Sequence, residues 1–347
     1  MSIDLYSTRT MLRALTQVKA ARTFLLSFFT SEEVHITEAV DIDVETGKRR
    51  LAPFVNPRLP GKVVEKRGYK TFTYKPPYVK PKNVTTAEDI LKRAAGQNLY
   101  VQDASELSDR AMDRLTKELA DLDDMITRRE EWMAAQALQT GSVPVVGDGV
   151  DEEVDFLMKT THKPTLSGSA LWSASTTAQP LTNLKTWKKL IAKDSGLSAT
   201  DVIMGSSAVE NFLENTKEIQ GANGLFNQRE IVMGRIQPVE LPGGVTYMGR
   251  IDAVGMDVWT YDEWYVDEAT DTEDEMMDPK KVLVLARGAR FTRHYGAIKD
   301  LDALAPYKRF PKQWDEKDPS VRYLMVQSAP LPAPHQIDAV VCAKVLA

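Results

Sequence analysis

The stretch from residue 103 to residue 139 constrains the fold most, because it predicts one unusually long helix. Apolar residues recur along it with spacings of four and three, while acidic and basic residues fill the other faces. The apolar stripe consists of Met112, Leu115, Leu119, Leu122, Ile126 and Met133, and Arg129 interrupts it. At 1.5 Å per residue, about 35 residues make a rod of roughly 50 Å. We therefore expect a strut that packs along one side only and ends at Gly141.

Composition indicates a soluble protein with a large core. The 347 residues are enough for two or three domains, and 43% of them are hydrophobic. The net charge of −5 argues against a fit of the whole chain to nucleic acid phosphates. The single cysteine, Cys342, excludes a disulfide framework within one chain. No stretch approaches the ~20 apolar residues of a membrane-spanning helix, so we expect a soluble protein made in the cytoplasm.

The segment before the long helix predicts structure that cannot stand alone. Residues 1–30 indicate amphipathic helix followed by the apolar hook FLLSFF, which needs a partner surface. Residues 31–72 predict strands, with GKVVEKRG and YKTFTY as a hairpin-like pair. This segment is polar on both faces, and a lone two-stranded hairpin is marginal in water. The prolines of YKPPYVKPK, residues 74–82, then impose an extended, stiff backbone.

Positive charge is concentrated in the same segment. Eleven lysines and arginines fall within 35 residues, against Glu45 and Glu65. They are Lys48, Arg49, Arg50, Arg58, Lys62, Lys66, Arg67, Lys70, Lys75, Lys80 and Lys82. Residues 267–278 are strongly acidic, so a basic segment of one copy could lie on an acidic surface of another. Nucleic acid is the other candidate partner, and a solvated basic loop is an equally good interpretation of these residues.

The remainder of the chain predicts mixed helices and strands. Helical patterns occur at TNLKTWKKLIAKDS and SSAVENFLENTKEI. Strand patterns occur at DVIMG and KKVLVLAR, and VTYMGRIDAVGMDVWTY predicts an antiparallel pair. The C-terminal stretch adds two strands with a proline break. The fold class is therefore α+β.

A search for chemistry finds no catalytic, cofactor or metal pattern. The stretch MGSSAVE is not a serine-nucleophile motif, and Ser207 with Glu210 instead predicts a capping box. The acidic stretch DIDVETG fails the calcium-loop test at its sixth and twelfth positions. The four histidines have no metal-ligand spacing, so we expect them to be exposed or locally bonded. They are His35, His162, His294 and His335. We expect the chain to bind no cofactor and to have no enzymatic activity.

Three stretches together resemble a known family. They are LAPFVNPRLPGKVVEKRG running into PPYVKPK, then RGARFTRHYGAIKDLDA, then RFPKQWDEKDPSVRYLMVQSAPLP. Their order and spacing are similar to those of the major capsid proteins of lambda-like tailed bacteriophages, the E-type branch of the Hong Kong 97 capsid fold. The resemblance spans nearly the whole chain.

The resemblance implies a Hong Kong 97-like division of the chain. It implies an N-terminal arm at 1–30, an extended loop (E-loop) at 31–85 and a P domain at 86–180 with the spine helix at 103–139. It also implies an A domain at 181–308 and C-terminal strands at 309–347. In such shells the E-loop lies over a neighbouring subunit, with residues 48–50 at its tip. The residues expected at that intersubunit contact are Lys48, Arg49, Arg50, Tyr74, Tyr78 and Lys80, although Tyr74 and Tyr78 could also pack on the spine helix. The crosslinking residues of some relatives have no match here.

The implied function is that of a major head protein of a tailed phage, a structural protein of the virion. It would self-assemble, as hexamers and pentamers, into an icosahedral procapsid in the host cytoplasm. The procapsid would mature and enclose double-stranded DNA, held non-specifically. Separate scaffold, portal and decoration proteins are the implied partners, and no membrane is. The alternatives are an encapsulin-like compartment shell and, from a different class, a nucleic-acid-binding module using residues 48–82.

Overall fold

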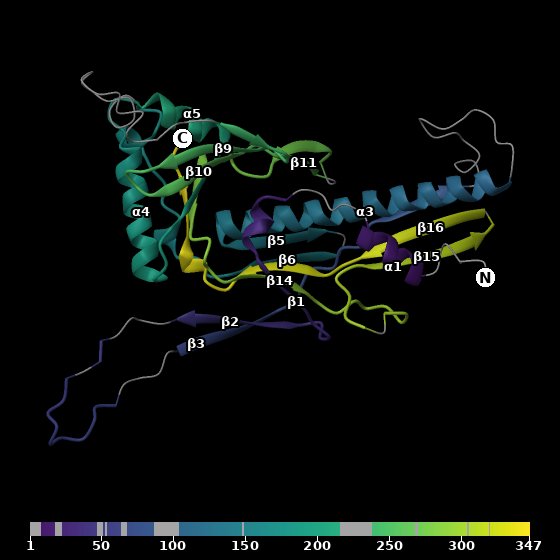
Figure 1. Ribbon diagram of the computed structural model, residues 1–347, viewed down its shortest axis with the longest axis horizontal. Coiled ribbons are helices and arrows are strands. Elements are labelled where there is room, and N and C mark those ends of the chain that lie inside the picture. Colours follow the sequence, from purple (N-terminus) through teal and green to yellow (C-terminus); the bar gives the residue numbers. More distant parts are fainter. Residues whose placement is uncertain are drawn as a thin grey trace.

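One long helix organises the molecule. The computed structural model describes residues 8–17, 23–46, 51–52, 54–63, 68–86, 104–147, 149–215, 238–267, 270–303, 305–318 and 320–347. The helix α3 (Ala104–Thr140) runs along the body, and short sheets lie against it. A larger sheet with helices α4 (Pro180–Asp194) and α5 (Ser206–Glu214) forms one end (Figure 1). A two-stranded hairpin leads away from the body.

The apolar stripe of α3 is buried over most of its length. The stripe residues Leu115, Leu119, Leu122, Ile126 and Met133 are at most 7% exposed. The first four of these pack with Met11 of α1 (Thr8–Gln17) and with Leu324 and Val326 of β16 (Ser320–Gln327). Met112 is the exception, because this cluster begins at Leu115, one turn later, and leaves Met112 46% exposed. The expectation that Met112 seats the helix is therefore wrong.

The last part of α3 is covered on more than one side. Ala134, Ala135 and Leu138 belong to the main core, whereas Met133 and Ala137 belong to a separate cluster with Phe156. The three alanines have small side chains, which let backbones on different sides approach the helix. The expectation that the helix packs along one side only is wrong for this part.

Gly141 ends the helix, as the sequence predicts. Its φ is +75°, in the left-handed region that glycine enters at little cost. Its N–H donates to the carbonyl of Ala137 at 3.1 Å, and an added Cβ would collide with Met158. The chain can therefore turn back at once into the next strand.

Three small sheets lie along α3. The first has the order β15-β16-β4, with β15 at Phe310–Lys317 and β4 at Lys82–Thr86. The second has the order β1-β14-β17, with β1 at Ser31–Val34, β14 at Phe291–Tyr295 and β17 at Pro330–Pro334. The third is the hairpin of β5 (Ser142–Gly147) and β6 (Val150–Asp155). Strands from both ends of the sequence thus pack on one helix.

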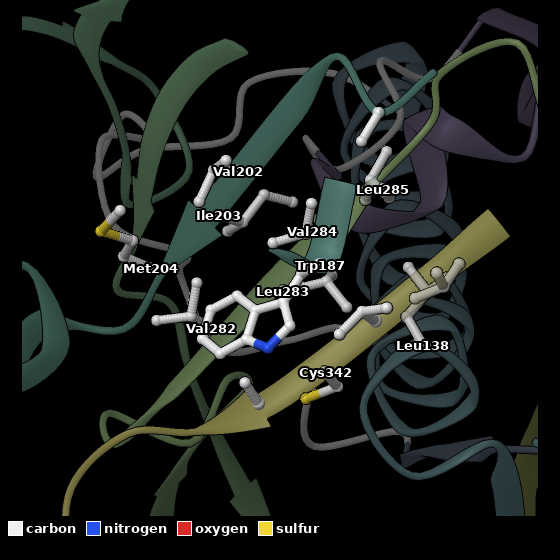
Figure 2. Packing of buried hydrophobic residues seen from close by; sticks show 14 of the residues in the cluster. Leu138, Trp187, Val202, Ile203, Met204, Val282, Leu283, Val284, Leu285 and Cys342 are labelled. Atoms are coloured by element: carbon white, nitrogen blue, oxygen red, sulfur yellow. The ribbon is translucent and has the colours of Figure 1, made fainter. Parts of the chain in front are cut away.

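The main core surrounds a six-stranded sheet of order β18-β13-β7-β10-β9-β8. The strands are β7 (Asp201–Met204), β8 (Val239–Leu241), β9 (Val245–Ile251), β10 (Met256–Tyr261), β13 (Lys281–Leu285) and β18 (Val340–Lys344). The predicted antiparallel pair is confirmed as β9 and β10. Three neighbouring strands are apolar without alternation because both of their faces are buried: β7 over Val202–Met204, β13 over Val282–Leu285 and β18 over Val340–Ala343. Figure 2 shows their side chains with Leu138, Trp187 and Cys342 in one cluster.

The predicted capping box at the start of α5 is wrong. The N-cap is Gly205, and no side chain caps this end of the helix. Ser206 and Ser207 already lie in the first turn. A Cβ at position 205 would collide with the backbone of Pro279, so the close approach of that loop requires glycine.

In the part of the chain that the structure describes, two further hairpins lie outside these sheets. In one, β2 (Val40–Thr46) pairs with β3 (Gly68–Tyr74), from Val40 opposite Tyr74 to Thr46 opposite Gly68. YKTFTY therefore pairs with β2, the strand before the loop. The sequence-based prediction that it pairs with GKVVEKRG is wrong. In the other, β11 (Trp264–Asp267) pairs with β12 (Thr272–Glu275), and β12 lies inside the acidic stretch 267–278.

The packing of α3 makes a testable contrast. Leu119→Ala should lower the free energy of unfolding by about 2–5 kcal/mol, because it leaves a cavity in a fully buried cluster. Met112→Ala, on the same helix, should change it by less than about 0.5 kcal/mol. Denaturant unfolding of both variants measures the difference. Equal effects would contradict the burial described for this helix.

Candidate assembly interface

The hairpin of β2 and β3 is the candidate functional element, and β1 fixes where it begins. β1 lies parallel to β14, with Glu32 opposite Arg293 and Glu33 opposite His294. Side chains alternate between the two faces of a strand. Glu32 therefore points to one side of the sheet, whereas Glu33 and His35 point to the other.

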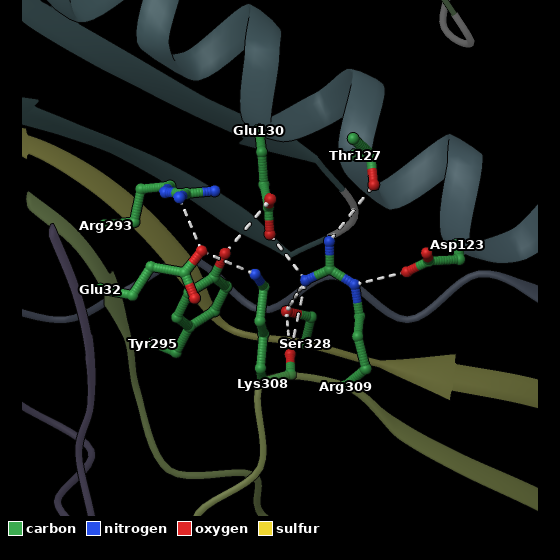
Figure 3. A network of polar contacts seen from close by, with 9 residues as sticks. All are labelled: Glu32, Asp123, Thr127, Glu130, Arg293, Tyr295, Lys308, Arg309 and Ser328. Carbon is green, nitrogen blue, oxygen red and sulfur yellow. Dashed lines mark hydrogen bonds and ion pairs between the residues drawn. The ribbon is translucent and has the colours of Figure 1, made fainter. Parts of the chain in front are cut away.

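Glu32 ties β1 to the body through two cations. Its carboxylate lies 2.6 Å from Nη2 of Arg293 and 2.9 Å from Nζ of Lys308 (Figure 3). Burial acts to raise the pKa of Glu32, but Lys308, Arg293 and Arg309 together outweigh it and lower the pKa below its usual value. Ion pairs thus hold β1, the strand that leads into the hairpin, on the body of the subunit.

A buried cation joins this face to the spine helix. Arg309 donates from Nη1 to Glu130 at 2.6 Å and to the hydroxyl of Ser328 at 2.9 Å, and from Nε to Asp123 at 2.8 Å (Figure 3). Burial disfavours the charged guanidinium, but Glu130 and Asp123 outweigh it and raise the pKa of Arg309. One arginine therefore bridges two turns of α3 to the loop before β15.

The adjacent residue of α3, Glu131, holds the N-terminal segment. Its carboxylate accepts hydrogen bonds from the backbone N–H groups of Phe24, Leu25 and Leu26 at 2.7–3.0 Å, and from the hydroxyl of Tyr261 at 2.8 Å. These amides open a 3₁₀ turn, Leu25–Phe28, whose apolar side chains enter the main core. The apolar hook expected to need a partner finds it within this chain.

The return leg of the hairpin is attached to its own chain. Val79 and Ser328 exchange two backbone hydrogen bonds of 2.8 and 2.9 Å. Tyr74 donates to the carbonyl of Asp155, and Tyr78 donates to Oε1 of Gln327. Both hydroxyls are therefore used inside the subunit and hold the return leg on β6 and β16. Lys80 is exposed and lines a hollow of about 350 Å³ with Tyr78, Lys299, Asp300, Met325 and Gln327.

The far part of the hairpin exposes apolar side chains. We call residues 51–52 and 54–63 the extended segment; it has no helix or strand. Leu51 is 95% exposed, Phe54 105% and Val63 95%. Lys48, Arg49 and Arg50, the expected loop tip, lie outside the described residues.

Residues 7–345 match the family model described as phage major capsid protein E. The chain belongs to the phage major capsid protein E family. The major capsid protein of Enterobacteria phage P21 is 30% identical to it over 347 residues, covering 95% of this chain and 96% of the relative. The major capsid protein of Escherichia phage lambda is 27% identical over 349 residues, with the same coverage. The predicted kinship with lambda-like capsid proteins is confirmed, and with it the function of a phage major capsid protein.

Solved structures agree with this assignment at the level of the fold. A prophage protein from Escherichia coli CFT073, described as a capsid protein, superposes with a TM-score of 0.71 at 20% identity. That likeness covers 97% of this capsid protein and 98% of the other chain. A phage-related protein from Bordetella bronchiseptica RB50 gives a TM-score of 0.50 at 16% identity. Among the described residues of this capsid protein, no helix is long and apolar enough to span a membrane.

The expectation that the histidines are exposed or locally bonded is wrong for all four. His35, His294 and His335 are separated by 259 and 41 positions, yet they form one hydrogen-bonded chain. His162 is also buried, and it bonds to the carbonyl of Val340 and to Asp194, which lie 178 and 32 positions away. Strand pairing between distant segments brings the three together, and no spacing along the sequence carries that information.

The buried cation of the capsid protein is expected to be costly to remove. Arg309→Met should lower the free energy of unfolding by about 3–5 kcal/mol, because Glu130 stays buried without its charge partner. Lys308→Met, one residue earlier, breaks only half-exposed contacts and should cost less than about 1 kcal/mol. Chemical denaturation of the two variants gives the comparison. A similar small cost for both would show that the Arg309 bridge does not hold the helix.

The lowered pKa of Glu32 sets a direction for acid sensitivity. A carboxyl group whose pKa is lower in the folded state contributes stability above its unfolded pKa and loses it as the pH falls through the folded value. The folded protein should therefore lose stability on acidification below about pH 5. Glu32→Gln should lose less over the same range. Unfolding midpoints of both proteins at several pH values test this, and parallel curves would refute it.

Proposed function

We propose that many copies of this capsid protein assemble into an icosahedral procapsid that expands and encloses double-stranded DNA. The role is structural, in the virion shell, with assembly in the host cytoplasm. The observation that carries the proposal is the extended segment, which presents apolar side chains to solvent far from its own core.

Away from its base, where Val40 is buried against the body, the hairpin has little to stabilise it within one subunit. β2 and β3 form an isolated two-stranded pair, and such pairs are marginal in water. The extended segment beyond them adds Leu51, Phe54, Leu59 and Val63, all at least 64% exposed. Soluble monomers rarely leave so many large apolar side chains on one short stretch. A neighbouring copy is the natural cover, since every subunit of a shell carries the same loop and the same receiving surface.

Charge supports the same placement. Arg58, Lys62, Lys75 and Lys80 on the loop are exposed, and so are Glu273 and Asp274 on β12. Attraction between the basic loop of one subunit and an acidic surface of its neighbour would orient the two subunits and speed their association. We assign Lys80, together with Lys48, Arg49 and Arg50, to contacts with another subunit. Tyr74 and Tyr78 we assign to holding the return leg on its own subunit.

The pairing of the strands supports one adjustment to the domain boundaries that the family implies. We propose an arm at 1–30, an E-loop at 31–85, a P domain at 86–180 around α3, and an A domain around the six-stranded sheet. β14 pairs with β1 and β17 next to α3, so we end the A domain near residue 289 instead of 308. β18 returns to the six-stranded sheet from the C-terminal end.

The remaining partners follow from the same role. Hexamers and pentamers of this chain, a separate scaffold, a portal and a decoration protein would complete the particle. Packaged DNA would be held without sequence preference. A compartment shell or a nucleic-acid-binding module is less favoured, because the family and the named relatives are phage capsid proteins.

Phe54 offers a test of loop docking. Phe54→Ser should reduce the yield of assembled shells at least about tenfold, because a buried aromatic anchor is worth about 2 kcal/mol or more at an interface. Phe54→Leu keeps the apolar surface and should assemble. Electron microscopy and sedimentation of the purified proteins count the shells. Normal assembly of the serine variant would exclude a role for this side chain in the contact.

The same variants separate assembly from folding. Phe54 makes no buried contact in its own subunit, so neither change should shift the unfolding midpoint of unassembled protein. A shifted midpoint in Phe54→Ser would mean that the segment packs on its own chain instead.

A further inference from the structure

Three imidazoles and one carboxylate meet where the hairpin begins. Nε2 of His35 lies 2.9 Å from Nδ1 of His294, and Nε2 of His294 lies 3.0 Å from Nε2 of His335. His294 is 1% exposed and His335 is 6% exposed. His35 follows β1, His294 lies in β14 and His335 follows β17. Pairing of the three strands therefore builds the cluster.

Glu33 completes a set of three ligand atoms. One carboxylate oxygen, Oε2, lies 3.7 Å from Nδ1 of His294 and 4.0 Å from Nε2 of His35. With the 2.9 Å between the two nitrogens, these atoms form a triangle that surrounds one point. Strand alternation places Glu33 and His35 on the same face of β1, beside His294 on β14.

The triangle has the size that zinc requires. Bonds of about 2.0–2.1 Å in a tetrahedral site put neighbouring ligand atoms about 3.3–3.4 Å apart. The three separations here lie on both sides of that value, and shifts of a few tenths of an ångström would equalise them. Two imidazole nitrogens and one carboxylate oxygen suit zinc, whereas magnesium and calcium prefer oxygen ligands throughout.

We propose that Glu33, His35 and His294 bind one zinc ion, with the fourth position open to water or to a group from another subunit. His294 would bind through Nδ1, which leaves its Nε2–H to donate to His335. Such a second contact fixes the ring and its tautomer at metal sites. His35 would bind through Nε2 and carry its proton on Nδ1. His335 is then a positioning residue.

Solvent can reach one side of the cluster. Glu33 is about half exposed, which gives an ion a route from solvent.

A second group with similar composition serves as a contrast. His162, Asp194 and Asp338 also lie close together, but Nζ of Lys159 contacts Asp338 at 2.8 Å and Asp194 at 3.2 Å. A lysine cation already supplies the positive charge that a metal ion would bring there. That group is an ion-pair network and not a metal site.

An ion at Glu33, His35 and His294 would join the start of the hairpin to β14. The ligands come from one subunit, so the site is independent of the proposed assembly. Bound zinc would oppose separation of β1 from β14, since both strands contribute ligands.

Competition with a colorimetric zinc chelator tests the site on the purified full-length chain. One zinc ion should bind per chain, with Mg²⁺ unable to displace it. Glu33→Gln and His35→Ala should each weaken zinc binding by about tenfold or more, and His335→Ala by about tenfold to hundredfold. Glu38→Gln is the matched control, because its carboxylate is equally exposed and nearby but bonds Lys299. It should leave zinc affinity unchanged.

Three results would overturn the proposal. They are the absence of saturable zinc binding, equal binding of Mg²⁺, and zinc binding that survives both Glu33→Gln and His35→Ala. Circular dichroism of each variant checks the fold. Glu33→Gln alters only a half-exposed side chain, so it keeps the test valid even if His35→Ala unfolds.

Discussion

The buried ion pair between Glu130 and Arg309 is the constraint on which the rest of the structure depends. A charged group inside a protein needs a partner, and here the partner comes from the loop before β15. Glu131, the next residue, accepts three backbone amides of the N-terminal segment. Consecutive residues of a helix point in different directions. Two carboxylates on one turn of α3 therefore orient the N-terminal segment and the C-terminal strands around the same helix.

This arrangement leaves the subunit rigid at one place and open at another. The core around α3 and the six-stranded sheet buries its apolar side chains almost completely. The extended segment between β2 and β3 does the opposite and exposes them. The base of the loop is held by contacts of Glu32, Val79, Tyr74 and Tyr78, and these contacts set its direction. Its far part remains exposed and available to another subunit. A phage capsid protein combines these properties, because a shell needs firm subunits and contacts that only a neighbour completes.

Sequence reasoning succeeded where a pattern is local and failed where distant strands pair. The stripe from Leu115 to Met133 and the stop at Gly141 are readable from spacing, and the family was recognisable from three stretches. Burial of Glu130 and Glu131 was not readable, since their partners, Arg309 and the Phe24–Leu26 amides, lie more than 100 positions away. The histidine cluster was missed for the same reason. The prediction for Met112 was wrong because periodicity identifies the apolar face of the helix but not the residue at which other elements begin to pack on that face.

The central claim is that a second copy covers the extended segment. A reconstruction of assembled shells by electron cryomicroscopy tests it most directly. The account predicts that residues 51–63 lie on a neighbouring subunit and that Phe54 and Leu59 are buried in the contact. Shells in which this segment stays in solvent, or folds back on its own subunit, would contradict it.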